Sequence, residues 1–553
     1  MLSEWVGRAP MRSQVNLQLT IGCRANGPTA VLPRPGGQGQ GVKAPRPRLA
    51  NGGVQPYPPA LNAINARAQT TVMPQSVRSR RPASLRTFRQ RSSAFLSGER
   101  PKFVALCLFV ACVFALGGGS RGDIQSLIVL RPAAFLFAAY AILVIRPDEL
   151  RAVRWPLILV GLLALLAAVQ LLPLPPEAWT RLPGRALFAE IARDAGLPLG
   201  YRPLTLAPAR TLNMALSLCV PLAAVLLVAI QSERGRRRIP VILLVGGIMS
   251  ALVAVAQVAG LGGGSLYLYR VTNPDFPVGL LANRNHQALL MAIVLILIAE
   301  TARRAGESGK QRPLVSIGLL IGSLVVLALL LASGSRAGLL FAAIAAPAAV
   351  VMVARGRSPG SEKGRGGIRK FRWAAAIGAA AVAVSGAMIL FSRAESIKRL
   401  WASDALEDYR LQRFPLLLDM VRDHWLAGIG FGAFEGAYKR YETVDALTPF
   451  IFNQAHNDWL QFAMEGGVPG LIILGLTLAV VLSRAKGVVA ATVRSGARTD
   501  FALLAIVIMI AVASVVDYPL RTPIFMMLGA IVATLLIMGD RAGAPGDGQS
   551  HPG

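Results

Sequence analysis

The sequence contains little charge for its length. Only 16% of its 553 residues are charged, whereas 54% are hydrophobic and the mean hydropathy is +0.52. Average globular chains carry about 25% charged residues. A soluble chain of this length would form about three or four domains, each with a charged exterior that this composition cannot supply. The apolar excess therefore predicts a folded membrane protein with several spans.

Histidine and cysteine, the residues that supply most zinc ligands, are also scarce. The chain has four residues of each type, and they form neither a Cys-x-x-Cys pair nor a His/Cys cluster at metal-ligand spacing. No disulfide framework or zinc site follows from this pattern. The sequence also lacks an Asp-x-Asp pair, which enzymes that bind nucleotide sugars through Mg²⁺ often use. We therefore expect no metal and no cofactor.

The formal net charge of +30 is concentrated near the N-terminus. Residues 1–102 are strongly basic, and Glu4 and Glu99 are their only acidic residues. Because this segment has no sustained apolar run, we expect a disordered cytoplasmic tail that contacts anionic membrane lipids. Nucleic-acid binding is the less favoured interpretation. Met73 lies nearer the first hydrophobic segment and is an alternative start of translation.

Long apolar runs predict an all-α polytopic membrane protein with about 12 transmembrane helices. A bilayer core of about 30 Å needs about 20 apolar residues per helix. Helices are required because lipid offers no partner for unpaired backbone groups, and the strand alternation of a barrel is absent. The predicted spans are Phe103–Gly119, Leu127–Ile145, Trp155–Pro173, Leu212–Gln231, Ile239–Gly260, His286–Ala302, Leu314–Ala332, Arg336–Ala354, Trp373–Phe391, Gly467–Ser483, Phe501–Asp517 and Pro523–Met538.

The basic residues of the loops predict the orientation, because cytoplasmic loops retain Lys and Arg. They cluster in one set of alternate loops, at Arg146–Arg154, Arg234–Arg238, Arg303–Arg312, Arg355–Arg372 and Arg484–Arg498. The short loops of the other set hold Arg121, Arg270, Arg284 and Arg521. Both termini are therefore predicted to be cytoplasmic, and two long outer connections, Leu174–Thr211 and Ser392–Gly466, to be periplasmic. Such long loops are uncommon unless they are functional.

The predicted organisation has five parts. They are the basic tail at 1–102, helices 1–9 within 103–391, a large periplasmic loop at 392–466 between helices 9 and 10, helices 10–12 within 467–539, and a cytoplasmic tail at 540–553.

The segment Asn453–Gly470, NQAHNDWLQFAMEGGVPG, is the most informative part of the chain. His456 begins an amphipathic turn suited to the membrane interface, and the glycines after it are expected to break that turn. Histidine is the side chain whose ordinary pKa, about 6.5, suits a general base near neutral pH. The alternative is an interfacial histidine that hydrogen-bonds to a loop carbonyl.

These residues resemble the bacterial O-antigen ligase and O-antigen polymerase superfamily of membrane glycosyltransferases. The family signature is a His, a small polar residue, nine residues of any type and then Gly-x-x-Gly. His456, Asn457, Gly467 and Gly470 satisfy it. Supporting fragments are GLLANRNHQALL at Gly279–Leu290, SGSRAGLL at Ser333–Leu340 and GIGFGAF at Gly428–Phe434. The resemblance covers roughly Gly119–Gly539 and implies that His456 is catalytic and that the loop 392–466 is the catalytic loop.

The resemblance also implies a substrate, a glycan joined to undecaprenyl diphosphate, and residues that bind its phosphates. Arginine suits this role because its planar fork makes charge-assisted contacts to phosphate oxygens. Arg336 matches the family's Ser-Arg motif, and Arg410 matches an arginine of the outer loop, with Arg413 one turn away. The alternatives are a snorkelling side chain for Arg336 and a salt bridge to a neighbouring acid for Arg410.

Other polar residues near the outer ends of the spans are supporting candidates. Asn283 and Asn285, with His286, could orient a sugar or cap the sixth span, and the cap is favoured. His424 is expected to be structural. Asp517 could pair with Arg521 four residues later, and Pro519 breaks the helix between the two residues.

The predicted activity is therefore transfer of a glycan from undecaprenyl diphosphate to an acceptor hydroxyl at the periplasmic face of the inner membrane. The acceptor is either lipid A-core, as in a ligase, or another glycan, as in a polymerase. The alternative class is a transporter of bicarbonate or another small anion. Transport would require ionisable residues at mid-membrane depth, and the predicted spans contain almost none. The lack of an internal repeat also counts against a transporter.

Overall fold

The structure, a computed structural model, describes residues 97–307, 313–355, 412–444, 451–495 and 499–539. Several predictions lie outside the described residues. They concern almost all of the basic tail, the ninth span Trp373–Phe391, the whole of the loop segment 392–411, and the C-terminal tail.

The described residues are mostly helical. The longer helices are α2 (Glu99–Leu116), α3 (Leu127–Val144), α5 (Arg154–Gln170), α8 (Pro208–Ser217), α9 (Cys219–Ala229), α10 (Glu233–Val258), α11 (Arg284–Glu307), α12 (Pro313–Ala332), α13 (Arg336–Arg355), α17 (Phe414–His424), α19 (Asp458–Ser495), α20 (Thr499–Val516) and α21 (Pro523–Gly539). Shorter helices are α4 (Pro147–Ala152), α6 (Pro176–Trp179), α7 (Ala186–Asp194), α18 (Phe434–Tyr438), η1 (Leu261–Gly264) and η3 (Pro519–Arg521). The strands β1 (Pro173–Leu174) and β2 (Arg202–Pro203) form one short antiparallel pair, with Pro173 opposite Pro203.

Five helical stretches are long and apolar enough to cross a membrane. They are Leu127–Val144, Pro208–Ala229, Glu233–Val258, Arg336–Val353 and Asp458–Ala490. Shorter apolar helices are Arg154–Gln170, Ile317–Ala332, Asp500–Val516 and Pro523–Gly539. Each predicted span that falls within the described residues overlaps a helix, which agrees with a helical membrane protein. The total of twelve spans stays a prediction.

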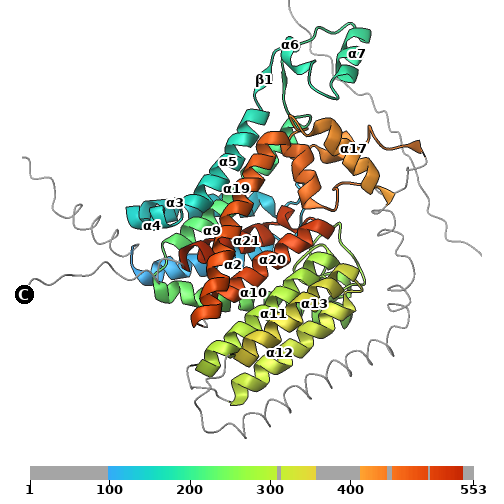
Figure 1. Ribbon diagram of the computed structural model, residues 1–553. Coiled ribbons are helices and arrows are strands. Elements are labelled where there is room, and N and C mark those ends of the chain that lie inside the picture. The colour runs from blue at the N-terminus through green and yellow to red at the C-terminus, as the bar shows by residue number, and fades with distance from the viewer. Residues whose placement is uncertain (1–96, 308–312, 356–411, 445–450, 496–498, 540–553) are drawn as a thin grey trace, which may run out of the picture. The chain divides into compact units, whose positions relative to one another are not determined.

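Helix α11 is the centre of the bundle. From Ala288 to Ala299 every side chain is buried, because α10, α12, α13 and α20 all pack on this helix. A helix that is apolar all round is expected to be surrounded by protein. Figure 1 shows α11 lying beside α12 and α13. The core also includes α2, α3, α9 and α21.

The loops that were predicted to be periplasmic gather at one end of this bundle. Ala282 donates its backbone N–H to Gly118 O (3.1 Å), and Leu206 donates to Ile429 O (2.9 Å). Ile524 donates to Gly117 O (3.1 Å). These contacts join loops that are far apart in the sequence. Successive helices run in alternating directions, so every second loop lies at the same end of the bundle.

Two segments at the loop end contain buried aromatic side chains. In the first, between β1 and β2, the indole of Trp179 is buried and donates Nε1–H to Gly200 O (3.0 Å). The second contains α17 and α18 and is built on an apolar cluster, comprising Leu417, Met420, Ile429, Ala433, Phe434, Ala437, Tyr438, Phe452, Ala455 and Met464. Figure 1 shows α6, α7 and α17 at the same end of the bundle.

Candidate active site

Two glycine-rich segments at the loop end pack backbone against backbone. Gly467 interrupts α19 with φ 58° and ψ −156°, which only glycine adopts readily. A Cβ on Gly467 would lie 2.6 Å from the backbone nitrogen of Gly428, which itself has φ 74°. Beside this contact, Ile429 donates its N–H to Met464 O (2.9 Å). The predicted break at this position is therefore present, and it docks the Gly-x-Gly segment onto α19.

Gln170, the last residue of α5, stabilises this junction. Its side chain is fully buried. Nε2 donates to Glu465 O (2.8 Å), and Oε1 accepts from Phe431 N (2.9 Å). A buried amide that satisfies two backbone groups from different segments fixes their relative position, because either group would be costly to leave unpaired.

The signature histidine lies immediately before α19. His456 has φ 51°, a left-handed conformation that is uncommon for residues other than glycine. Asn457 caps the helix, because its Oδ1 accepts from Leu460 N (3.0 Å). Gln461 reaches back and accepts from Ala455 N (2.9 Å). The small polar residue of the signature thus begins the helix, and the histidine is held at the turn before it.

Asp517, at the end of α20, is the partner of this histidine. Its Oδ1 lies 3.2 Å from His456 Nδ1, and the carboxylate is buried. An ionised carboxylate can only accept, so Nδ1 carries the proton in this contact. Proton transfer at the imidazole then falls to the other ring nitrogen, Nε2. This arrangement orients the imidazole as a base.

The same carboxylate links the histidine to two more helices. Asn285 donates from Nδ2 to Asp517 Oδ2 (2.8 Å), and Ser335 donates its hydroxyl to Asn285 Oδ1 (2.7 Å). Ser335 also caps α13, since its Oγ accepts from Gly338 N (3.0 Å). Arg336 is the first residue of α13. The structure therefore connects the Ser-Arg motif to the histidine signature through a buried chain of hydrogen bonds.

The other predicted site residues lie around this network. Asn283 accepts from Asn285 N (2.8 Å) in the manner of a cap for α11. Arg413 immediately precedes α17, which packs on α19. Gly470 lies beyond the break in α19, where a Cβ would meet Phe462 at 3.4 Å or more. Arg410 lies outside the described residues.

The suggested pair of Asp517 with Arg521 is wrong. Arg521 lies 3.0 Å from Glu465 (Nη2 to Oε2) and 3.4 Å from Asp458 (Nε to Oδ1). Pro519 starts the 3₁₀ turn η3 between the two residues, so the helical i,i+4 neighbourhood is lost. Arg521 instead joins η3 to the first turns of α19 and holds the helix that follows His456.

Aromatic rings surround the imidazole. Tyr518 lies edge-on at 4.8 Å and Phe452 at 5.6 Å between ring centroids. Tyr518 also packs on His286, whose Nδ1 lies 3.1 Å from Thr522 Oγ1. The side chain of His456 retains 14% exposure. The imidazole is thus packed in place but still accessible.

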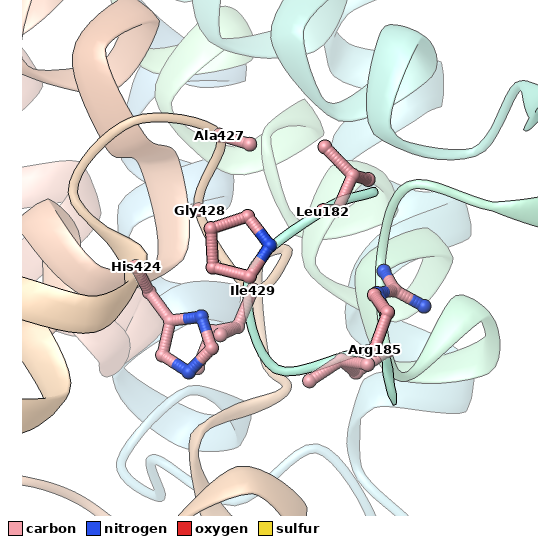
Figure 2. Close-up of a pocket in the computed structure, with 8 residues that line it drawn as sticks. Leu182, Arg185, His424, Ala427, Gly428 and Ile429 are labelled. Carbon is pink, nitrogen blue, oxygen red and sulfur yellow. The ribbon is translucent and has the colours of Figure 1, made fainter. Parts of the chain in front are cut away.

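A small pocket separates the two segments at the loop end (Figure 2). Arg185 lines one side and His424, Gly428 and Ile429 the other. Burial lowers the pKa of Arg185 to about 10, and the nearby Arg202 acts in the same direction. The guanidinium of Arg185 thus lies beside the Gly-x-Gly segment that docks on α19. None of the histidine-signature residues lines this pocket.

His424, for which a structural role was predicted, packs against Tyr441. It is buried, and its Nε2 lies 2.9 Å from the hydroxyl of Tyr441. That hydroxyl is also 2.8 Å from Asp423 Oδ2 and donates to it. The imidazole must then donate from Nε2 to the tyrosine oxygen. Burial lowers the pKa of His424, which favours the neutral ring.

Within the described ranges, no group of three or more His, Cys, Asp or Glu side chains is arranged to bind a metal ion.

Sequence reasoning missed Asp517 and Ser335 as members of the site. A signal for Asp517 was present, because it is an acid at the end of an apolar helix, and such residues are often functional. The spacing gave no indication of its partner, since Asp517 and His456 are 61 residues apart.

The fold and the site together define a multi-pass membrane protein with a paired histidine and aspartate at the loop end of its helical bundle. Residues 321–475 match a family model described as O-antigen ligase. The chain therefore carries a domain of the O-antigen ligase and polymerase superfamily, as the signature indicated. No curated protein matches the chain.

The matched stretch contains Arg336, Arg410, Arg413 and the whole histidine signature. The family indicates a glycosyltransferase-type enzyme of the bacterial inner membrane that acts on lipid-linked glycans. The alternative class, a small-anion transporter, gains no support from this match.

Proposed function

We propose that the protein transfers a glycan from undecaprenyl diphosphate to an acceptor hydroxyl at the periplasmic face of the inner membrane. The observation that carries this proposal is the pairing of His456 with Asp517 (3.2 Å) beside the start of α13, where Arg336 lies. A base and a cation for phosphate thus come from separate helices to one end of the bundle.

The reaction is an inverting displacement. The acceptor hydroxyl loses its proton to Nε2 of His456, and its oxygen bonds to the anomeric carbon of the glycan. The bond from that carbon to the diphosphate oxygen breaks, and undecaprenyl diphosphate leaves with the electron pair. Asp517 stabilises the imidazolium formed in this step, and general-base catalysis of this kind contributes about 10²–10⁴-fold to the rate.

Arginines supply the remaining stabilisation. Arg336, Arg410 and Arg413 bind the diphosphate and offset the negative charge that grows on it as the bond breaks. A well-placed donor of this kind commonly contributes about 3 kcal/mol. The leaving group is already a diphosphate, so the reaction needs no nucleotide, and the proposal includes no metal or cofactor. Both termini are cytoplasmic in this scheme.

The central test is substitution of His456. His456→Ala should abolish transfer of a labelled glycan from its undecaprenyl diphosphate carrier, while expression, membrane insertion and elution as a monodisperse species in detergent persist. His551→Ala removes a histidine that is not among the candidate site residues, and this matched control should retain activity. Transfer by His456→Ala at the wild-type rate would remove this residue from the mechanism.

The acceptor can be identified in the same assay. Membranes that contain the wild-type protein are incubated with the labelled lipid-linked repeat and either lipid A-core or unlabelled repeat. Label on lipid A-core identifies a ligase, and a ladder of longer glycans identifies a polymerase.

A further inference from the structure

An apolar groove opens on the surface of the bundle beside the connection that precedes α3. It has a volume of about 520 Å³. It is lined by Gly122, Asp123, Ile124, Gln125, Leu127, Ile128, Arg131, Pro132, Phe135 and Leu216. These residues belong to the first outer loop, to the outer half of α3 and to α8. The volume falls in the range of about 300–1,000 Å³ that is usual for ligand pockets.

Arg131 is the one charged residue of α3. It lies about one turn below the outer end of the helix, a depth of about 6 Å at 1.5 Å per residue. Its Nη2 donates to Asn213 O (3.0 Å) and Ser217 Oγ (2.9 Å), which are both neutral. Its Nε is buried and has no hydrogen-bond partner. An arginine within a membrane span is expensive to maintain and usually has a function.

The nearby carboxylate does not neutralise this charge. Asp123, at the rim of the groove, accepts two hydrogen bonds from Arg121 (3.0 and 3.1 Å). The groove therefore combines an apolar floor with an uncompensated cation just below headgroup level. That combination is complementary to a hydrocarbon chain with a phosphate at one end.

The first outer loop also contacts the segment that leads into the candidate active site. Asn213 of α8 donates from Nδ2 to Gly122 O (3.0 Å) on the groove side of the first outer loop. Earlier in the same loop, Gly118 O accepts from Ala282 N (3.1 Å). Ala282 directly precedes Asn283 and is three residues before Asn285, which contacts Asp517. A single loop thus borders both the groove and the hydrogen-bonded network of His456.

We propose that this groove binds the polyprenyl chain of the donor lipid next to its diphosphate, with Arg131 facing the phosphate end. This inference rests on the proposed function and adds to it the path by which the donor chain leaves the bilayer. A single branched chain suits one narrow groove, whereas lipid A and ordinary phospholipids bring two or more chains side by side.

Filling the groove tests the inference. Leu216→Trp and Ile128→Trp place an indole in the groove, and Leu143→Trp adds the same group to an 83% exposed position of α3 away from it. Each purified variant is assayed with two donors that carry the same glycan, one on undecaprenyl diphosphate and one on a diphosphate that bears a methyl group in place of the polyprenyl chain. The groove variants should raise KM for the long donor about tenfold, equivalent to ~1.4 kcal/mol of binding. Their KM for the short donor and all constants of the Leu143→Trp control should stay at wild-type values.

Three outcomes separate the two proposals. If the groove variants affect both donors equally, or neither donor, the groove does not bind the chain and the inference is overturned. If wild-type protein transfers glycan from neither donor to any acceptor, the proposed function fails, and the inference fails with it. If the wild type uses both donors and only the long one is impaired by the groove variants, both proposals stand.

Arg131 gives an independent measurement. Arg131→Gln should raise KM for both donors with little change in kcat, because the lost contact is to the diphosphate that both share. Arg131→Lys should recover part of the affinity. Unchanged KM in Arg131→Gln, with the variant folded, would show that the arginine only joins α3 to α8.

Discussion

At the scale of single residues, the site depends on one carboxylate. The two carboxylate oxygens of Asp517 accept hydrogen bonds from His456 Nδ1 and Asn285 Nδ2. The backbone N–H of Tyr518 donates a third hydrogen bond to this carboxylate (3.0 Å). A carboxylate held by several donors has a fixed direction, and a histidine bonded to it has a fixed tautomer. Asp517 is therefore a positioning residue that acts through His456.

Substitution of Asp517 should separate positioning from folding. We expect Asp517→Asn to lower kcat about 10²–10⁴-fold, the range of general-base catalysis, with a much smaller change in KM. The neutral amide no longer stabilises the imidazolium, so the acidic limb of the pH–rate profile should move to lower pH. Kinetics of glycan transfer between pH 5 and 9 measure both effects. A variant with reduced kcat and an unmoved pH profile would indicate a purely structural aspartate.

At the scale of elements, the break in α19 divides that helix into two functional parts. The part before Gly467 carries the cap of His456 and is held to η3 by Arg521. The part after it is an apolar span. The break is possible because Gly428 and Gly467 let two backbones approach to contact distance. The two glycine motifs of the family thus have one shared physical purpose in this chain.

The two signature glycines should differ in their tolerance to substitution. Gly467→Ala would place a Cβ 2.6 Å from the Gly428 nitrogen at φ 58°, so we expect a loss of roughly 1–3 kcal/mol of stability and of most transfer activity. Gly470→Ala is the matched control, since its Cβ would be at 3.4 Å or more from its neighbours. Thermal unfolding in detergent and the transfer assay compare the two variants. Equal destabilisation by both would contradict this account of the break.

At the scale of the whole molecule, separate outer segments meet over the end of the bundle. Arg210 of α8 and Glu435 of α18 form an ion pair (2.7 Å). Arg440 donates to Gly184 O, and Leu206 donates to Ile429 O. The outer segments therefore associate through a few polar contacts, and the buried imidazole of His424 lies beside Gly184 at one of them.

The stability of this outer region should decrease as the pH is lowered below about 6.5. Burial, with Arg440 and Arg185 nearby, lowers the pKa of His424 below its ordinary value of 6.5, although Asp423 acts in the opposite direction. Above pH 6.5 the ring is neutral in both states. Below it the unfolded chain binds the proton more readily, so stability falls until the pH passes the pKa of the folded state.

Thermal unfolding in detergent at pH 7.5 and 5.5 measures this effect. The wild-type Tm should decrease at the lower pH. His424→Gln should have a lower Tm at pH 7.5, because a buried contact to Tyr441 is altered, and a smaller decrease between the two pH values. An equal decrease in the variant would assign the acid sensitivity to other groups.

The sequence by itself determined the helical membrane architecture, the signature histidine and the break after it. Long apolar runs, a His-Asn pair and consecutive glycines act locally, so their consequences can be read from neighbouring residues. Only the tertiary structure decided which residues meet His456. Asp517 and Asn285 lie 232 residues apart, and their contact depends on how α11, α13 and α20 pack. The i,i+4 spacing of a helix pointed instead to Arg521 as the partner of Asp517. The turn at Pro519 directs Arg521 towards Glu465. Helix packing sets such pairings through the shapes of whole surfaces, and the spacing of polar residues along the chain does not encode them.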